Sequence, residues 1–132
     1  MKTQDPAGDA ARISRTILVV DDDPVVNHLL CRTLRQAGYQ VLSAADGLEA
    51  LDCLKRHPVD LILSDVVMPQ LDGVALSMRV RAEPAWARIP LVIMSAADTR
   101  AFPPNLATQI IQKPLTLDAL DRLLHDLLLD RA

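Results

Sequence analysis

Short apolar runs recur along the chain and alternate with segments of helical pattern. The runs lie at residues 17–20 with Thr16, and at 41–44, 61–63, 91–94 and 109–111. They are rich in β-branched residues and do not alternate between apolar and polar positions, which is typical of strands buried on both faces of a parallel sheet. The pattern therefore predicts a parallel sheet whose strands are connected by helices.

Most of the segments between these runs, and the last segment of the chain, place apolar residues at helical spacing. The positions are Val26, Leu30, Leu34 and Ala37, then Leu48, Leu51 and Leu54, then Val74 and Met78 with Arg81, and finally Leu117, Leu120, Leu124, Leu127 and Leu128. Pro24 and Thr116 suit helix starts, and Gly38 suits a helix end. The order βαβαβαβ, followed by an unclear segment and then βα, predicts a doubly wound α/β domain with right-handed crossovers.

The unclear segment covers residues 95–109, where the alternation leads us to expect another helix. Pro103 and Pro104 cannot both lie inside a helix, because each removes a hydrogen-bond donor and clashes with the preceding turn. We therefore expect this fourth helix to be short, broken or absent. We also expect one folded domain over residues 16–130, preceded by a disordered polar leader at residues 1–15.

Composition and charge limit the class of protein. Of the 132 residues, 50% are hydrophobic and 23% are charged, and the net charge is -3. This balance gives no electrostatic footprint for nucleic acid or an anionic membrane, and no apolar run approaches the ~20 residues that span a bilayer. We therefore expect a protein that binds neither nucleic acid nor a membrane.

The cysteines and histidines offer no catalytic or metal-binding spacing. Cys31 and Cys53 lie on separate predicted helices without a partner at zinc-site or disulfide-framework spacing, and we expect both to be reduced packing residues. We therefore expect a cytoplasmic protein. His28, His57 and His125 likewise have no partner at metal or triad spacing. We expect each histidine to lie at the surface.

Polar residues follow the predicted strands at the edge where ligand sites of doubly wound sheets form. They are Asp21, Asp22 and Asp23 after the first strand, Ser64 and Asp65 after the third, Ser95 after the fourth and Lys113 after the fifth. Clustered carboxylates suit a hard cation such as Mg²⁺, and a carboxylate beside Mg²⁺ and a lysine can act as a nucleophile toward phosphorus. Taken singly, Asp22 or Asp23 could instead cap the following helix, as Asp72 would cap another.

The motifs "ILVVDDDP", "DLILSDVVMPQLDG", "LVIMSA" and "QKPL" occur in that order. Together they resemble the receiver domain of bacterial two-component response regulators, of the single-domain, chemotaxis-regulator-like kind, over about residues 16–129. The resemblance implies a flavodoxin-like receiver fold, a doubly wound five-stranded parallel sheet flanked by helices. It also implies Mg²⁺ as the cofactor.

The resemblance carries over to individual residues. Asp65 would be the phosphoacceptor, Ser95 the switch hydroxyl and Lys113 the phosphate-binding lysine, with a cis peptide bond between Lys113 and Pro114. The metal site would comprise Asp21, Asp22, Asp65 and the backbone carbonyl of Val67. Asp23 would be peripheral.

The implied function is a phosphorylation-dependent signalling switch that takes a phosphoryl group from a phosphohistidine on a sensor histidine kinase or phosphotransfer protein. It would not be a turnover enzyme. Because no output domain follows Ala132, we expect a stand-alone regulator, phosphate relay or sink that acts on an unidentified downstream protein. Two alternatives remain: a receiver-like interaction module that is not phosphorylated, and a phosphohydrolase, which Val67 disfavours because such enzymes need a second carboxylate at that position.

Several positions depart from the family pattern. Ile110 stands where the family has an aromatic switch residue, and the segment from Ser95 to Lys113 is shorter than usual by about a helical turn. Val67 and Ala97 cannot orient a hydrolytic water, so we expect slow self-dephosphorylation. The last helix has extra leucines at Leu123 and Leu129, which either pack on the sheet or form a partner or homodimer surface.

Overall fold

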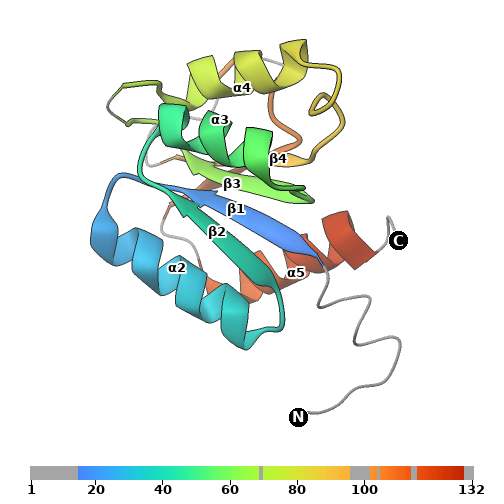
Figure 1. Cartoon of the computed structure of the whole chain (residues 1–132). Helices are drawn as coiled ribbons and strands as arrows, with labels where there is room; N and C mark the ends of the chain where they lie inside the picture. Colours follow the sequence, from blue (N-terminus) through green and yellow to red (C-terminus); the bar gives the residue numbers. More distant parts are fainter. Residues whose placement is uncertain (1–14, 69, 96–101, 104, 114–115, 130–132) are drawn as a thin grey trace.

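A central sheet with helices on both faces forms the fold (Figure 1). The computed structural model describes residues 15–68, 70–95, 102–103, 105–113 and 116–129. Residues 1–14 of the expected leader therefore lie outside the described residues, as do Ala97 and Pro114. None of the helices in the described ranges is long and apolar enough to cross a membrane.

The strands are β1 (Thr16–Val20), β2 (Gln40–Ala44), β3 (Leu61–Asp65), β4 (Leu91–Ser95) and β5 (Gln109–Gln112). They form one parallel sheet in the order β2-β1-β3-β4-β5, which confirms the predicted doubly wound topology. After β1 the chain places β2 on one side and β3 on the other. The strand order therefore reverses between β1 and β3, and ligand sites of such sheets form at this reversal.

The helices are α2 (Pro24–Gln36), α3 (Gly47–Arg56), α4 (Gly73–Ala82) and α5 (Leu117–Leu124), which continues as the π-helical turn η2 (His125–Leu129). Each α-helix begins with a side-chain cap that accepts a hydrogen bond from a backbone N–H: Asp23, Asp46, Asp72 and Thr116. These caps satisfy donors that the first turn of a helix leaves free. The predicted capping roles of Asp72 and Thr116 are thus confirmed, and of the two candidates Asp22 and Asp23 it is Asp23 that caps α2.

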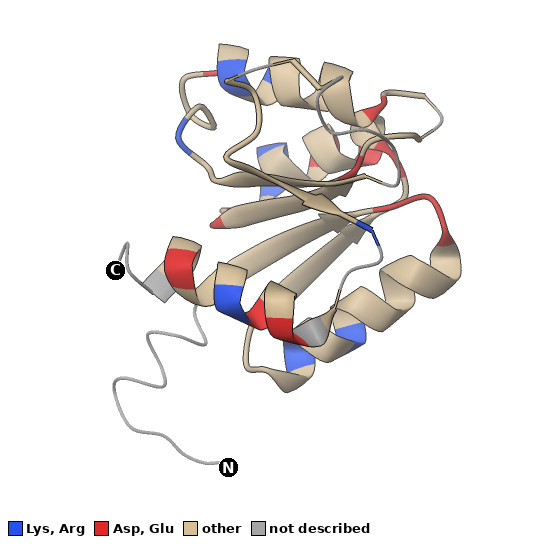
Figure 2. Ribbon diagram, turned by 180° about the vertical axis from the view of Figure 1, so that it is seen from behind, with Lys and Arg blue, Asp and Glu red and all other residues tan. Residues whose placement is uncertain are grey.

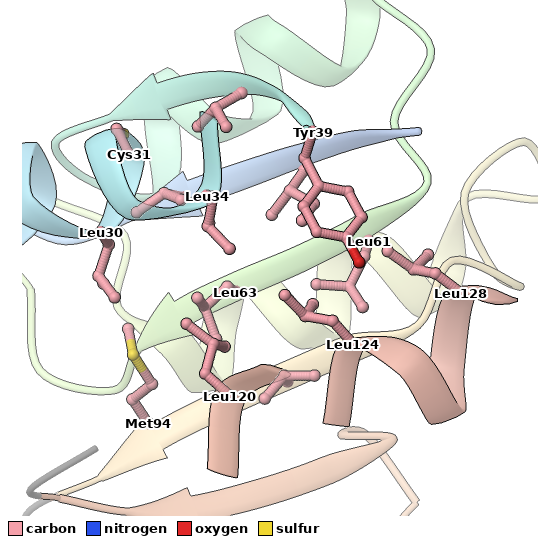
Figure 3. Packing of buried hydrophobic residues seen from close by; sticks show 14 residues of the cluster. Leu30, Cys31, Leu34, Tyr39, Leu61, Leu63, Met94, Leu120, Leu124 and Leu128 are labelled. Atoms are coloured by element: carbon pink, nitrogen blue, oxygen red, sulfur yellow. The ribbon is translucent and has the colours of Figure 1, made fainter. Parts of the chain in front are cut away.

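Two apolar layers hold the helices on the sheet. One contains α2 and α5 residues that meet Leu61, Leu63 and Met94 from the strands (Figure 3). The other contains α3 and α4 residues on the opposite face. The apolar residues of β1, β3 and β4 are buried, as the apolar runs without polar alternation predicted. The prediction is wrong for β2 and β5, which are only partly buried because each lies at an edge of the sheet.

The buried face of α4 differs from the predicted one. Met78 is 57% exposed, whereas Leu76, Ser77 and Val80 are buried. The periodicity misled because α4 carries apolar residues on every side, so that no single stripe stands out. Leu48 of α3 was also assigned to a buried stripe and is 50% exposed instead.

The exposure of their side chains tests the predictions made for the cysteines, the histidines and Leu123. Cys31 is buried and Cys53 half-buried, both as free thiols within the apolar layers, and burial raises the pKa of each. The histidines are exposed, as predicted. Leu123 is partly buried against the α2/α5 layer, which favours sheet packing over a partner surface at this position.

Between β4 and β5, the described residues 102–103 and 105–108 contain no helix. Phe102, Ala107 and Ile110 are partly buried against the α3/α4 layer. The described part of this segment thus agrees with the expectation of a short or broken fourth helix. Residues 96–101 and 104 lie outside the described ranges.

Candidate functional site

Carboxylates meet where the strand order reverses. Val20 at the end of β1 pairs in register with Ser64 of β3, so the residues that follow, Asp21 and Asp65, come from neighbouring strand ends. One carboxylate oxygen from each of Asp21, Asp22 and Asp65 lies within 4.8 Å of the others. Three carboxylates at this separation repel one another, and a hard divalent cation offsets that repulsion.

Asp21 is the buried member of the cluster, with 1% of its surface exposed. Its Oδ1 accepts a hydrogen bond from the backbone N–H of Asp23 at 2.9 Å, and its Oδ2 is buried without a hydrogen-bond partner among the described residues. Burial raises the pKa of Asp21; the Asp23 N–H and the Lys113 ammonium act against this rise, and the charges of Asp65 and Asp22 add to it. A bound cation would satisfy the orphaned oxygen, so the donor set fits Mg²⁺.

Asp65 is held at both of its carboxylate oxygens. Oδ1 accepts a hydrogen bond from the Val66 N–H at 2.8 Å, and Oδ2 lies 3.3 Å from the Lys113 Nζ. The side chain is only partly buried, so an approaching reactant can reach it. The ammonium group beside it can stabilise negative charge that develops on a transferred group.

β4 and β5 bring Ser95 and Lys113 to the same edge. The backbone N–H of Lys113 donates to the Ser95 carbonyl oxygen at 2.7 Å. Asp65 pairs in register with Met94, the residue before Ser95. Asp65, Ser95 and Lys113, three of the residues predicted at the strand ends, therefore lie at one rim of the sheet.

The loop after Asp65 follows a path that a glycine permits. The N–H of Gly73 donates to the Val66 carbonyl oxygen at 2.7 Å. A Cβ at position 73 would lie 2.5 Å from the Asp65 carbonyl oxygen, closer than atoms can approach. Val67 lies in this loop and is 78% exposed at the rim.

Asn27 belongs to the site, although the sequence analysis did not identify it. It is buried, and its Nδ2 donates to the carbonyl oxygens of Asp21 and Ala44, each at 3.0 Å. Its Oδ1 accepts hydrogen bonds from Ser43 Oγ at 2.7 Å and Cys31 Sγ at 3.3 Å. The side chain therefore ties the ends of β1 and β2 together beneath the acids. Its only sequence signal is a polar residue among the apolar positions of α2.

The fold and this cluster define a flavodoxin-like α/β domain that brings three carboxylates together at one edge of its sheet, with a lysine beside one of them. The family model of the response regulator receiver domain matches residues 17–125. The chain therefore belongs to the response regulator receiver family, which confirms the resemblance found in the sequence.

Curated relatives are longer than this chain. It is 38% identical to a sensor histidine kinase, RcsC of Salmonella typhi, over 112 residues that make up 82% of the chain and 12% of the kinase. It is 39% identical to the response regulator GtcR of Aneurinibacillus migulanus over 84 residues, 64% of the chain and 34% of GtcR. Receiver domains thus occur both in kinases and in regulators among these relatives.

Solved receiver structures have the same fold. The chemotaxis response regulator CheY4 of Vibrio cholerae superposes with a TM-score of 0.81 at 29% identity, covering 87% of this chain and 99% of that one. The receiver domain of the Pseudomonas aeruginosa sensor histidine kinase PA1611 superposes with a TM-score of 0.79 at 30% identity, covering 86% and 97%. The PA1611 structure has a magnesium ion coordinated in its active site cleft.

Proposed function

We propose that this protein is a phosphorylation-dependent signalling switch that accepts a phosphoryl group on Asp65. One observation carries the proposal: Asp65 lies 3.3 Å from the Lys113 Nζ and also shares a cluster with Asp21 and Asp22. A nucleophilic carboxylate, a cation-binding pair and a fixed ammonium are the groups that phosphoryl transfer to aspartate requires.

Each side chain has a distinct part in the transfer. A carboxylate oxygen of Asp65 forms the new bond to phosphorus while the bond from phosphorus to the donor's imidazole nitrogen breaks, and the electron pair stays on that nitrogen. Lys113 stabilises negative charge on the phosphoryl oxygens, and the Ser95 hydroxyl donates to one of them after transfer. Mg²⁺, held by Asp21, Asp22, Asp65 and the Val67 carbonyl, would neutralise charge on the same oxygens.

The phosphodonor in this proposal is a protein that carries a phosphohistidine, either a sensor histidine kinase or a phosphotransfer protein. The first turns of α2 leave Val25 73% exposed and Leu29 60% exposed. These residues are four positions apart and therefore lie on one side of the helix that begins beside the acids. An apolar strip next to the acceptor supports docking of a protein donor.

The test is the intact mass of the protein after incubation with acetyl phosphate and Mg²⁺. We expect one added phosphoryl group, which is absent in Asp65→Asn and after chelation of the metal. Asp22→Asn serves as a matched control that removes a carboxylate of the cluster but leaves the acceptor, and it should slow the reaction without changing the site of addition.

A second candidate function is a receiver-like interaction module that is not phosphorylated. It is favoured by Ile110, which takes the place of the aromatic switch residue and is partly buried against the α3/α4 layer. If Mg²⁺ binds but no phosphoryl group is added, the switch proposal is wrong and this module is the better description.

A further inference from the structure

A groove of about 460 Å³ lies at the end of the sheet away from the acids. It is formed by the last turn of α3, the residues that lead into β3, and the turn before β4. Because α3 ends there and parallel strands β3 and β4 begin there, the groove is at the opposite end of the strands from Asp65. We call it the basic groove and define it by Lys55, Arg56, Val59, Trp86 and Ile89, together with Arg88 at its continuation.

The floor of the basic groove is apolar. Val59, Trp86 and Ile89 are partly buried and pack against the α3/α4 layer, and Leu54 beneath them is buried within that layer. An apolar side chain placed on this floor would extend an existing hydrophobic core. Tryptophan is also one of the residues that are enriched at the hot spots of protein interfaces.

The rim of the basic groove is cationic. Lys55 and Arg56 line it, and the adjoining hollow, which shares Val59 and Ile89, adds Arg88. Within the described residues no carboxylate forms an ion pair with Lys55 or Arg88, whereas Arg56 is 3.3 Å from Asp52. Figure 2 shows basic positions in α3 and in the turn before β4, while acidic positions gather in the loops at the other end of the sheet.

Two carboxylates at this end are already engaged. Asp60 accepts a hydrogen bond from the Thr16 N–H at 2.7 Å and lies 3.9 Å from Arg15 Nη1. Glu83 accepts a hydrogen bond from the Ala85 N–H at 3.3 Å. The positive charges of Lys55 and Arg88 are therefore left for a partner, although the whole chain has a net charge of -3.

We propose that the basic groove binds an acidic segment of a partner protein that places an apolar side chain on Trp86. Helix stabilisation alone would explain cations in the last turn of α3, since they complement the helix dipole. It would not explain Arg88, which lies outside any helix, or the partly exposed Trp86 between the charges. Because the groove is remote from Asp65, this binding does not depend on phosphorylation.

The single tryptophan of the chain makes the proposal directly measurable. The probe is a short synthetic peptide of glutamate and leucine, free of tryptophan and tyrosine, titrated into the full chain while the emission of Trp86 is recorded. We expect a saturable change that weakens as salt is added, and no saturable change with a matched peptide of lysine and leucine.

Charge-reversal variants test whether the acidic peptide binds in the basic groove. Lys55→Glu combined with Arg88→Glu should weaken binding of the acidic peptide about tenfold, because both unpaired cations are replaced by repelling charges. The matched control is Arg32→Glu combined with Arg122→Glu, which reverses the same number of exposed charges on α2 and α5. It should bind the peptide much as the wild type does.

The proposal is overturned if Trp86 emission shows no saturable change up to about 1 mM peptide, the weakest affinity of interest. It is also overturned if the control variant loses binding equally. Asp65→Asn should bind the peptide like the wild type, and the groove variant should still be phosphorylated by acetyl phosphate. The experiments therefore distinguish an error in the proposed peptide binding from an error in the proposed phosphorylation of Asp65.

Discussion

Asp21 is a buried carboxylate whose second oxygen has no hydrogen-bond partner among the described residues. Since burial raises its pKa above the ordinary value of 3.8, folding favours the protonated form. The stability associated with this shift is present at low pH and is lost as the pH rises through the folded-state pKa. At neutral pH without metal, the ionised side chain therefore destabilises the fold.

We predict that Asp21→Asn stabilises the metal-free protein at neutral pH by about 1 kcal/mol, because the neutral amide removes a buried charge that Asp65 and Asp22 repel. The asparagine Oδ1 can still accept from the Asp23 N–H. The measurement is thermal unfolding in a chelator at several pH values, where the gain should shrink toward pH 3.8 as the wild-type carboxyl becomes protonated.

Two comparisons complete this test. Asp22→Asn removes an exposed carboxylate and should give a smaller gain. Added Mg²⁺ should stabilise the wild type more than Asp21→Asn. A variant that is no more stable than the wild type in the chelator would contradict the destabilising role of Asp21.

Val67 bears on how long a phosphoryl group on Asp65 would last. It is 78% exposed at the rim and cannot hydrogen-bond a water molecule with its side chain. We predict that Val67→Asn speeds loss of the phosphoryl group about tenfold, equivalent to about 1.4 kcal/mol of activation free energy. The readout is intact mass over time after acetyl phosphate is removed; Val67→Ala is the control, and equal rates in both variants would refute the water-orienting argument.

At this scale the sequence predicted the acids and the lysine but missed Asn27. Asp21, Asp65 and Lys113 could be placed because parallel strands end at one edge, so strand assignment alone brings them together. A polar residue in a helix gives no comparable signal, since most such residues are exposed. Only the packing of α2 against β1 and β2 shows that Asn27 is buried and that it donates hydrogen bonds to carbonyl oxygens at the ends of both strands.

Among the elements, α4 carries an unexpected connection through Arg81. Its guanidinium donates to the carbonyl oxygens of Leu106 at 2.8 Å, Ala87 at 2.9 Å and Ile89 at 2.8 Å, and to Thr108 Oγ1 at 3.2 Å. Burial lowers the pKa of Arg81 below its usual value. One side chain thus joins the end of α4 to the turn before β4 and to the residues before β5.

We predict that Arg81→Lys destabilises the fold by about 2 kcal/mol, because a lysine ammonium cannot match the fork of a guanidinium and leaves partly buried carbonyl groups unpaired. Urea unfolding measures the change. Arg79→Lys is the matched control, an exposed arginine on the same helix, and it should stay within about 0.5 kcal/mol of the wild type. Equal effects of the two substitutions would show that Arg81 is not an anchor.

The sequence predicted an element well where its apolar residues coincide with its buried surface, and poorly where apolar residues also lie on its exposed side. The strands could be located because both of their faces are apolar, and α2 because Leu30 and Leu34 mark one face. In α4 the buried face could not be assigned, since Met78 and Leu76 are equally apolar and only the sheet decides between them. Arg81 was read as one position of that helix, because hydrogen bonds to distant backbone carbonyls leave no trace in local periodicity.

For the molecule as a whole, the ends of the sheet differ in charge and in exposed apolar surface. The acidic end carries Asp21, Asp22 and Asp65 next to the exposed Val25 and Leu29 of α2. The other end carries the basic groove. A donor protein that reaches Asp65 would therefore contact α2, while the basic groove stays free.

We predict that Leu29→Asp slows phosphoryl transfer from a phosphohistidine protein about tenfold or more, since it places a charge in the apolar strip beside the acceptor. The rate with acetyl phosphate should not change, because a small donor needs no docking surface. Met78→Asp, which alters an exposed apolar residue on α4, should affect neither donor. Equal slowing with both donors would indicate damage to the site rather than loss of docking.

The contacts of Arg81 have a consequence for how this chain can vary. Three of its four acceptors are backbone carbonyl oxygens, and these carbonyls of Ala87, Ile89 and Leu106 would be present whatever side chains those positions carried. Substitutions there can accumulate without loss of the anchor, whereas an insertion or deletion would move a carbonyl out of reach. Related chains that keep this arginine should therefore differ freely in the sequence of these turns but hold their length constant.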